Sequence, residues 1–85
     1  MTKAERANYL ASIQVRSALI GAEMAEAALA RNLSWMISST LKLRLFITDN
    51  VNPFFRCNSE DVLLEIDAHV ARLRIMMKNR ARAAS

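Results

Sequence analysis

The sequence predicts an all-α fold, and two observations lead to this prediction. The chain of 85 residues contains one Gly and one Pro, whereas a β-sandwich or barrel needs turn residues about every ten positions. Apolar residues recur at alternating steps of three and four, the spacing of one face of an α-helix. With 53% apolar and 24% charged residues, the composition is that of a folded chain. We therefore expect one small helical domain over residues 1–85.

The first predicted helix covers residues 3–31. Thr2 and Glu5 form a capping-box pattern, which satisfies backbone N–H groups at a helix start. One apolar face carries Leu10, Ile13, Ser17, Ile20, Met24 and Ala27, and a nearly opposite face carries Ala4, Ala11, Val15, Ala18, Ala22, Ala25, Leu29 and Leu33. A helix that is apolar on two sides packs against something on each side.

Small residues recur along this first helix, at Ser17, Gly21 and Ala25. A mid-helix Gly costs about 1 kcal/mol of helix stability relative to Ala. Close approach of another helix would compensate for that cost, so we predict a helix–helix interface at these three positions. The alternative is that Gly21 is simply tolerated.

The second predicted helix covers about residues 34–48, with Ser34 as its N-cap. Residues 41–47 begin with a period-two alternation that also fits a β-strand. We favour a helix because a single strand would have no partner in this chain. A loop over residues 49–58 should follow, since Asn52 precedes Pro53 and the α conformation is disfavoured there. Phe54 and Phe55 are expected to fill the core.

The last predicted helix covers residues 59–80, capped by Asn58 or Ser59, and residues 79–85 are expected to fray as a basic tail. Acidic residues occupy its first half and basic residues its second, an order that complements the helix macrodipole. This helix also has two apolar sides, one of which carries Leu64, Ala68, Ala71 and Ile75. We predict that these four residues form an interface.

Helices that are apolar on two sides predict that this chain has a binding partner. A three-helix chain of this size buries each helix mainly on one side, so the surplus apolar surface must be covered by something else. The chain should complete its core by forming a homodimer, or should dock on an unidentified protein.

The sequence shows no catalytic or metal-binding motif. Phosphate loops are excluded because they need more than one Gly. Cys57 and His69 stand without a recognisable triad, and Asp61, Glu65 and His69 make a row that offers three ligands at most. Ordinary helix pairing explains that row equally well. We therefore expect no enzyme, no metal and no cofactor.

A modest net charge of +4 leaves nucleic acid open as a partner. The basic residues of the last helix that would contact phosphates are Arg72, Arg74, Lys78, Arg80 and Arg82. The chain has neither a signal peptide nor an apolar run long enough to span a bilayer, so we expect a cytoplasmic protein.

These observations predict a non-enzymatic helical interaction module. It would self-associate, bind a partner protein to regulate it, or do both. Adaptors, inhibitors and small phage or mobile-element proteins that bind host machinery are typical of short helical chains. The alternative is a basic helical dimer that regulates by binding nucleic acid through its last helix.

Overall fold

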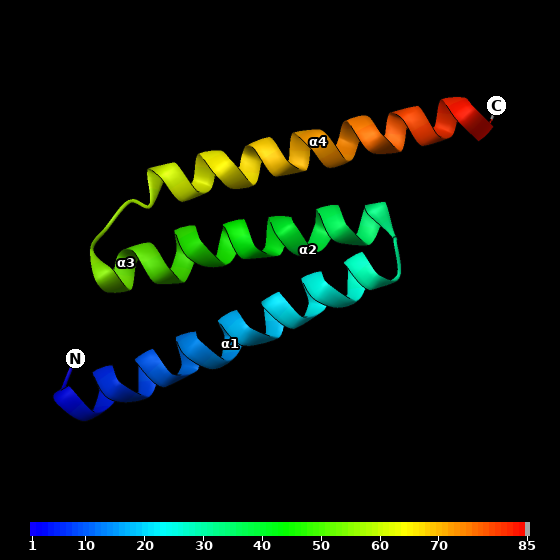
Figure 1. The fold of residues 1–85 in the computed structure, drawn as a ribbon. Coiled ribbons are helices and arrows are strands. Elements are labelled where there is room, and N and C mark those ends of the chain that lie inside the picture. Colours follow the sequence, from blue (N-terminus) through cyan, green and yellow to red (C-terminus); the bar gives the residue numbers. More distant parts are fainter. Residues whose placement is uncertain (85) are drawn as a thin grey trace.

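The computed structural model describes residues 1–84. Its elements are α1 (Lys3–Leu29), α2 (Leu33–Phe46), a π-helical segment η1 (Ile47–Val51), the short α3 (Asn52–Phe55) and α4 (Glu60–Ala84) (Figure 1). No strand occurs over these residues, which confirms the all-α fold class. Residues 41–47 are helical, so the strand alternative is wrong.

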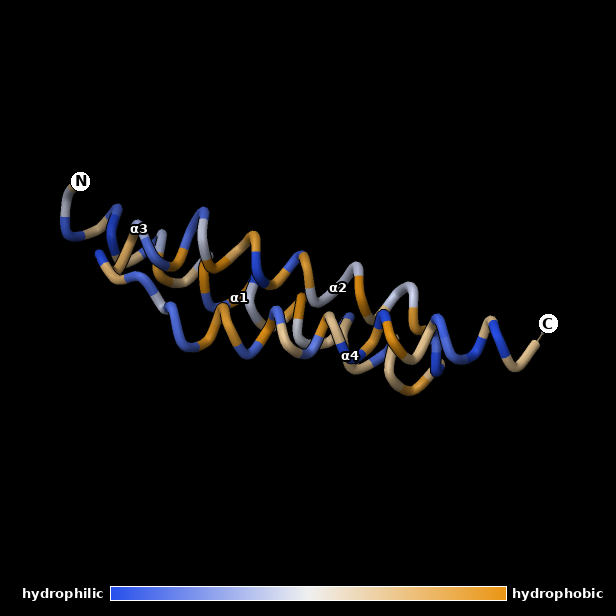
Figure 2. The backbone as a smooth tube through the Cα atoms, turned by 90° about the horizontal axis from the view of Figure 1, so that it is seen from above, coloured by the Kyte–Doolittle hydropathy of each residue, from blue (hydrophilic) through white to orange (hydrophobic). Residues whose placement is uncertain are grey.

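The three long helices form a single open layer. α2 lies in the middle and packs against α1 on one side and α4 on the other, whereas α1 and α4 do not pack together along their lengths (Figure 1). The Cα atoms span 58 × 24 × 13 Å, and the helices overlap in one narrow band when the layer is turned (Figure 2). The radius of gyration is 15.8 Å, against about 12 Å for a compact domain of this length.

The turn between α1 and α2 lies slightly earlier than predicted. α1 ends at Leu29 rather than residue 31, and Arg31 adopts a left-handed conformation with φ 53°. The N-cap of α2 is Asn32, whose Oδ1 accepts a hydrogen bond of 3.0 Å from the Trp35 N–H. Ser34 is therefore not the cap but a residue of the helix. Asn and Ser cap helices about equally well, so the sequence could not discriminate between them.

The predicted loop over residues 49–58 is mostly helical. The chain continues from α2 through η1 and α3 to Phe55, and only residues 56–59 are irregular. Asn52 adopts helical angles despite the following proline. Pro53 lies in the first turn of α3, where a helix tolerates a missing N–H.

α4 begins at Glu60 and continues to Ala84, so the predicted end at residue 80 is wrong, and the predicted tail is helical as far as residue 84. The Asn58 Oδ1 accepts a hydrogen bond of 3.4 Å from the Glu60 N–H two residues on, as in an Asx turn, and the Ser59 carbonyl accepts the first helical bond, of 3.0 Å from the Leu63 N–H. The final turns consist largely of Ala and Arg, which are strong helix formers. Arg80 also donates a hydrogen bond of 3.3 Å from Nη1 to the Arg31 carbonyl. Ser85 lies outside the described residues.

The core is small and lies along both sides of α2. Its buried apolar residues are Ile13, Ala27, Leu33, Phe46, Ile47, Ile66, Val70 and Leu73. Ser39 and Thr40 are also buried, and both hydroxyls donate to the Met36 carbonyl, at 3.1 and 2.7 Å. These bonds satisfy the hydroxyls within α2.

The adjacent phenylalanines do not fill this core as predicted. Phe54 is half-buried and stacks on Tyr9 with ring centroids 5.1 Å apart, while Phe55 is 50% exposed. Phe54 also lies under Arg6 of α1, whose guanidinium carbon is 4.4 Å from the ring centroid, and Phe55 packs edge-on against Phe54 with centroids 4.9 Å apart.

Candidate functional site: a groove between α1 and α4

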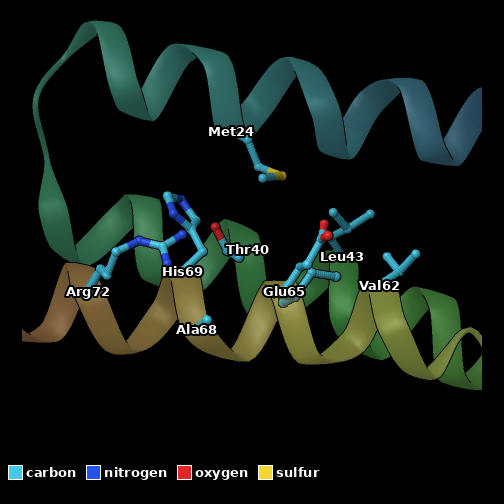
Figure 3. Close-up of a pocket in the computed structure, with 9 residues that line it drawn as sticks. Met24, Thr40, Leu43, Val62, Glu65, Ala68, His69 and Arg72 are labelled. Atoms are coloured by element: carbon cyan, nitrogen blue, oxygen red, sulfur yellow. The ribbon is translucent and has the colours of Figure 1, made fainter.

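A groove of about 400 Å³ runs between α1 and α4. Thr40 and Leu43 of α2 line it, and Met24 reaches into it from α1 (Figure 3). The lining from α4 consists of Val62, Glu65, Ile66, Ala68, His69 and Arg72. The groove exists because α1 and α4 both pack on α2 without packing on each other.

The opposite face of the layer carries the ion pairs that join the helices. The Lys42 Nζ lies 2.9 Å from the Glu23 Oε1, and the Arg44 Nε lies 2.7 Å from the Asp67 Oδ1. At about 100° per residue, Asp67 lies about 160° around α4 from the groove residue Glu65. Lys42 lies about 160° around α2 from Thr40 in the same way.

These pairs shift the pKa values of their members. Hydrogen bonds from Lys42 and from the Trp35 indole Nε1 lower the pKa of Glu23 below its ordinary 4.5. The hydrogen bond between Arg44 and Asp67 lowers the pKa of Asp67 below 3.8 and raises that of Arg44. Glu23 and Asp67 are therefore ionised at neutral pH, and the face opposite the groove is charged and exposed to solvent.

Arg16 also belongs to this charged face of the layer. Its guanidinium carbon lies 5.1 Å from the centroid of the Phe46 ring, within cation–π range. Its Nε is shielded from solvent and has no hydrogen-bond partner among the described residues. Contact with the Phe46 ring joins this side chain to α2.

The predicted interface residues of α4 are all exposed. Leu64 and Ile75 are 60% and 59% exposed and face away from α2, as does Ala71. Ala68 lies at the edge of the groove. The structure thus leaves the second apolar side of α4 uncovered.

The predicted interface residues of α1 are exposed as well. Ser17, Gly21 and Ala25 are all exposed, and a Cβ added at Gly21 would meet nothing within 4 Å among the residues described. Ser17 and Gly21 lie seven and three positions before Met24, so they share its side of α1 and border the groove. Ala25 lies about 100° further around the helix.

The basic residues of α4 do not share one side of the helix. Arg72 lines the groove, whereas Arg74 and Lys78 lie four residues apart on the side of Asp67. Arg80 binds the Arg31 carbonyl and lines a second hollow, of about 480 Å³, beside the α1–α2 turn. Arg82 lies in the last turn of the helix.

Residues with catalytic or metal-binding chemistry are dispersed. Cys57 is exposed, with its Sγ 3.4 Å from the Asn52 Oδ1 and 3.7 Å from the Ser59 Oγ. Glu65 and His69 line the groove, while Asp61 does not. Across residues 1–84, no three His, Cys, Asp or Glu side chains gather as a metal site would require.

Sequence reasoning placed Met24 on an apolar face but did not identify the groove that it borders with Thr40 and Leu43. The pair Ser39–Thr40 is the available signal, because small hydroxyl residues are otherwise uncommon at the buried positions of a central helix.

Comparison with protein-family models, curated proteins and solved structures finds no match to this chain. None of the helices described is long and apolar enough to cross a membrane.

Proposed function

We propose that this protein is a non-enzymatic helical interaction module that works by self-association. One observation carries the proposal: α1 and α4 pack on α2 and its continuation rather than on each other, which leaves an open layer with an unfilled groove. A helical layer that is apolar on a second side requires another surface to cover it.

The exposed area supports this proposal. The chain exposes 6154 Å², whereas a compact monomer of 9.6 kDa exposes about 5,100 Å². The surplus of about 1,000 Å² is similar to the area that one partner buries in an interface of standard size, about 800 Å².

Sedimentation equilibrium between about 1 and about 100 μM tests the proposal, because this range covers ordinary homodimer affinities. We expect a mass of twice the 9.6 kDa of the chain at the upper concentration. A mass of one chain across the whole range would overturn self-association.

Regulation of a partner protein, as an adaptor or an inhibitor, is the use that we propose for the assembled module. Self-association through one face leaves the charged face, with Glu23, Lys42, Arg44 and Asp67, free for such a partner. Capture experiments with the dimer as bait would test this use against a variant with those four charges removed.

Nucleic-acid binding by α4 is the alternative function. Its support is the run of five basic residues after residue 71 without an acid, on a helix that stays regular to Ala84. Their distribution around the helix does not give the single basic stripe that follows a phosphate backbone. Retention on heparin at about 50 mM salt would favour this alternative, since phosphate contacts are strongest at low salt.

A further inference from the structure

We propose that the groove of each chain is filled by α1 of a second copy, in a two-fold symmetric dimer. This inference rests on the self-association proposed above and adds the surface and the helix that occupies it. The argument has three steps: the charge of the two faces, the free side of α1, and the space at Gly21.

The two faces of the layer differ in charge. One member of each interhelical ion pair, Lys42 on α2 and Asp67 on α4, lies on the side of its helix away from the groove. On the groove face, α1 contributes Met24, Ser17 and Gly21, and α2 contributes Thr40 and Leu43, all of them uncharged. Charged groups at the groove come from α4 alone, as Glu65 and Arg72 with His69 between them. The groove face is the one that can be buried at lower desolvation cost.

The chain itself supplies a helix side that fits this groove. Between Arg6 and Glu23 the only charged residue is Arg16, which is held against Phe46 on the other face. The outward side of α1 is mostly small or aliphatic, with Glu26 as a charged residue near its C-terminal end; the other residues are Ala11, Val15, Ala18, Ala22, Ala25 and Leu29. Side chains of this size let a helix enter a narrow groove.

Self-complementarity identifies a second copy as the occupant. The mostly apolar groove and the mostly uncharged outward side of α1 are neighbours on one chain. A two-fold axis beside α1 would therefore bring the groove of each copy against α1 of the other, and the same contact would form twice. The surplus exposed area of about 1,000 Å² per chain corresponds to an interface of about 2,000 Å² in total, within the range of stable homodimers.

Gly21 explains where the two α1 helices cross. It lies on the groove side of α1, and its missing Cβ faces open space in the single chain. Nothing within the chain therefore requires Gly at this position, although it costs about 1 kcal/mol of helix stability relative to Ala. A second α1 crossing here would use the space that a side chain would fill.

Two matched pairs of variants test the proposal by sedimentation. Gly21→Leu should raise the dimer Kd about ten- to a hundredfold by overpacking the crossing, while Ala71→Leu makes a similar enlargement on the outer side of α4 and should leave the Kd unchanged. Val62→Glu puts a charge on the groove wall and should also weaken the dimer, whereas Leu45→Glu on the opposite face should not. Val62 and Leu45 are 47% and 61% exposed, so neither change disturbs the core.

The outcomes separate this inference from the proposed function. A monomeric wild-type chain overturns both. A dimer that is dissociated by Ala71→Leu but not by Gly21→Leu overturns the groove and places the interface on the outer side of α4, while self-association stands. A dimer whose Kd is changed by neither Gly21→Leu nor Val62→Glu also overturns the inference that α1 of a second copy fills the groove. Circular dichroism provides the folding control, because Leu has a higher helix propensity than Gly and helix content should not fall.

Discussion

Asn32 connects the two halves of the α1–α2 hairpin. Its extended backbone follows Arg31, which is left-handed, and its side chain caps the first turn of α2. An N-cap oxygen satisfies a backbone N–H that has no partner within the helix. The orientation of α2 against α1 therefore depends on a side chain at the surface of the protein.

Replacing Asn32 by Ala should lower the free energy of unfolding by about 1 kcal/mol, because the Trp35 N–H loses its partner. For a domain of this size that corresponds to a fall in Tm of about 4–8 °C. Ser34→Ala is the matched control, since Ser34 lies inside α2, and its Tm should stay the same or rise slightly. Equal losses for the two variants would contradict the assigned cap.

Acid should weaken the protein partly through Glu23 and Asp67. Their folded-state pKa values are lowered below 4.5 and 3.8, so their contribution is present above those values and is lost as the pH falls through the lowered ones. Tm measured from about pH 5 to about pH 3 should fall less steeply in the variant E23Q/D67N than in the wild type. The difference should be small, because both pairs are at the surface. Parallel curves would show that these ion pairs do not stabilise the fold.

At the scale of the element, α4 has one side that is buried against α2 and stabilises the fold, and an outer side that is exposed and contributes little to stability. Leu73 is 2% exposed against α2, while Leu64 on the outer side is 60% exposed. Leu73→Ala should cost about 2–5 kcal/mol of unfolding free energy. Leu64→Ala should change it by less than about 0.5 kcal/mol in the monomer. Urea unfolding of the two variants at low concentration makes the comparison, and a large loss for Leu64→Ala would mean that its side of α4 is covered.

The helices themselves could be predicted because their apolar spacing and caps are local properties of the sequence. Thr2 was identified as a cap correctly, and its Oγ1 accepts from the Glu5 N–H at 3.1 Å. The segment after α2 could not be predicted in the same way. Asn52 before Pro53 favours an extended backbone locally, but η1 and α3 keep the chain helical there. In this helical conformation Phe54 stacks on Tyr9. The two residues are far apart in sequence, so local sequence rules do not include their contact.

The candidate site was predicted only in part, for a related reason. Periodicity showed that α1 and α4 each have two apolar sides, which the structure leaves half uncovered. It could not show that α1 and α4 avoid each other, and that separation is what creates the groove lined by Thr40 and Leu43. Which helix lies in the middle is a property of the assembled chain, not of any one helix.

At the scale of the whole molecule, the open layer predicts an extended shape in solution. The isolated chain should have a radius of gyration near the 15.8 Å of its Cα trace. A closed three-helix bundle of this length would have a radius of gyration of about 12 Å. Small-angle X-ray scattering of Gly21→Leu at low concentration measures it without the dimer. A value near the smaller figure would show that α4 folds over the groove onto α1.

Because α1 and α4 pack mainly on α2 and its continuation and not along each other, the fold resembles a short stack of nearest neighbours more than a bundle with a shared centre. In such a stack, each interface contributes to stability nearly independently, as in repeat proteins. The most extensive contacts join long helices that follow one another along the chain, so assembly can proceed by adding one helix at a time and should be fast. The outer helices can then open separately, which makes amide protection highest in α2 and lower on both sides of it.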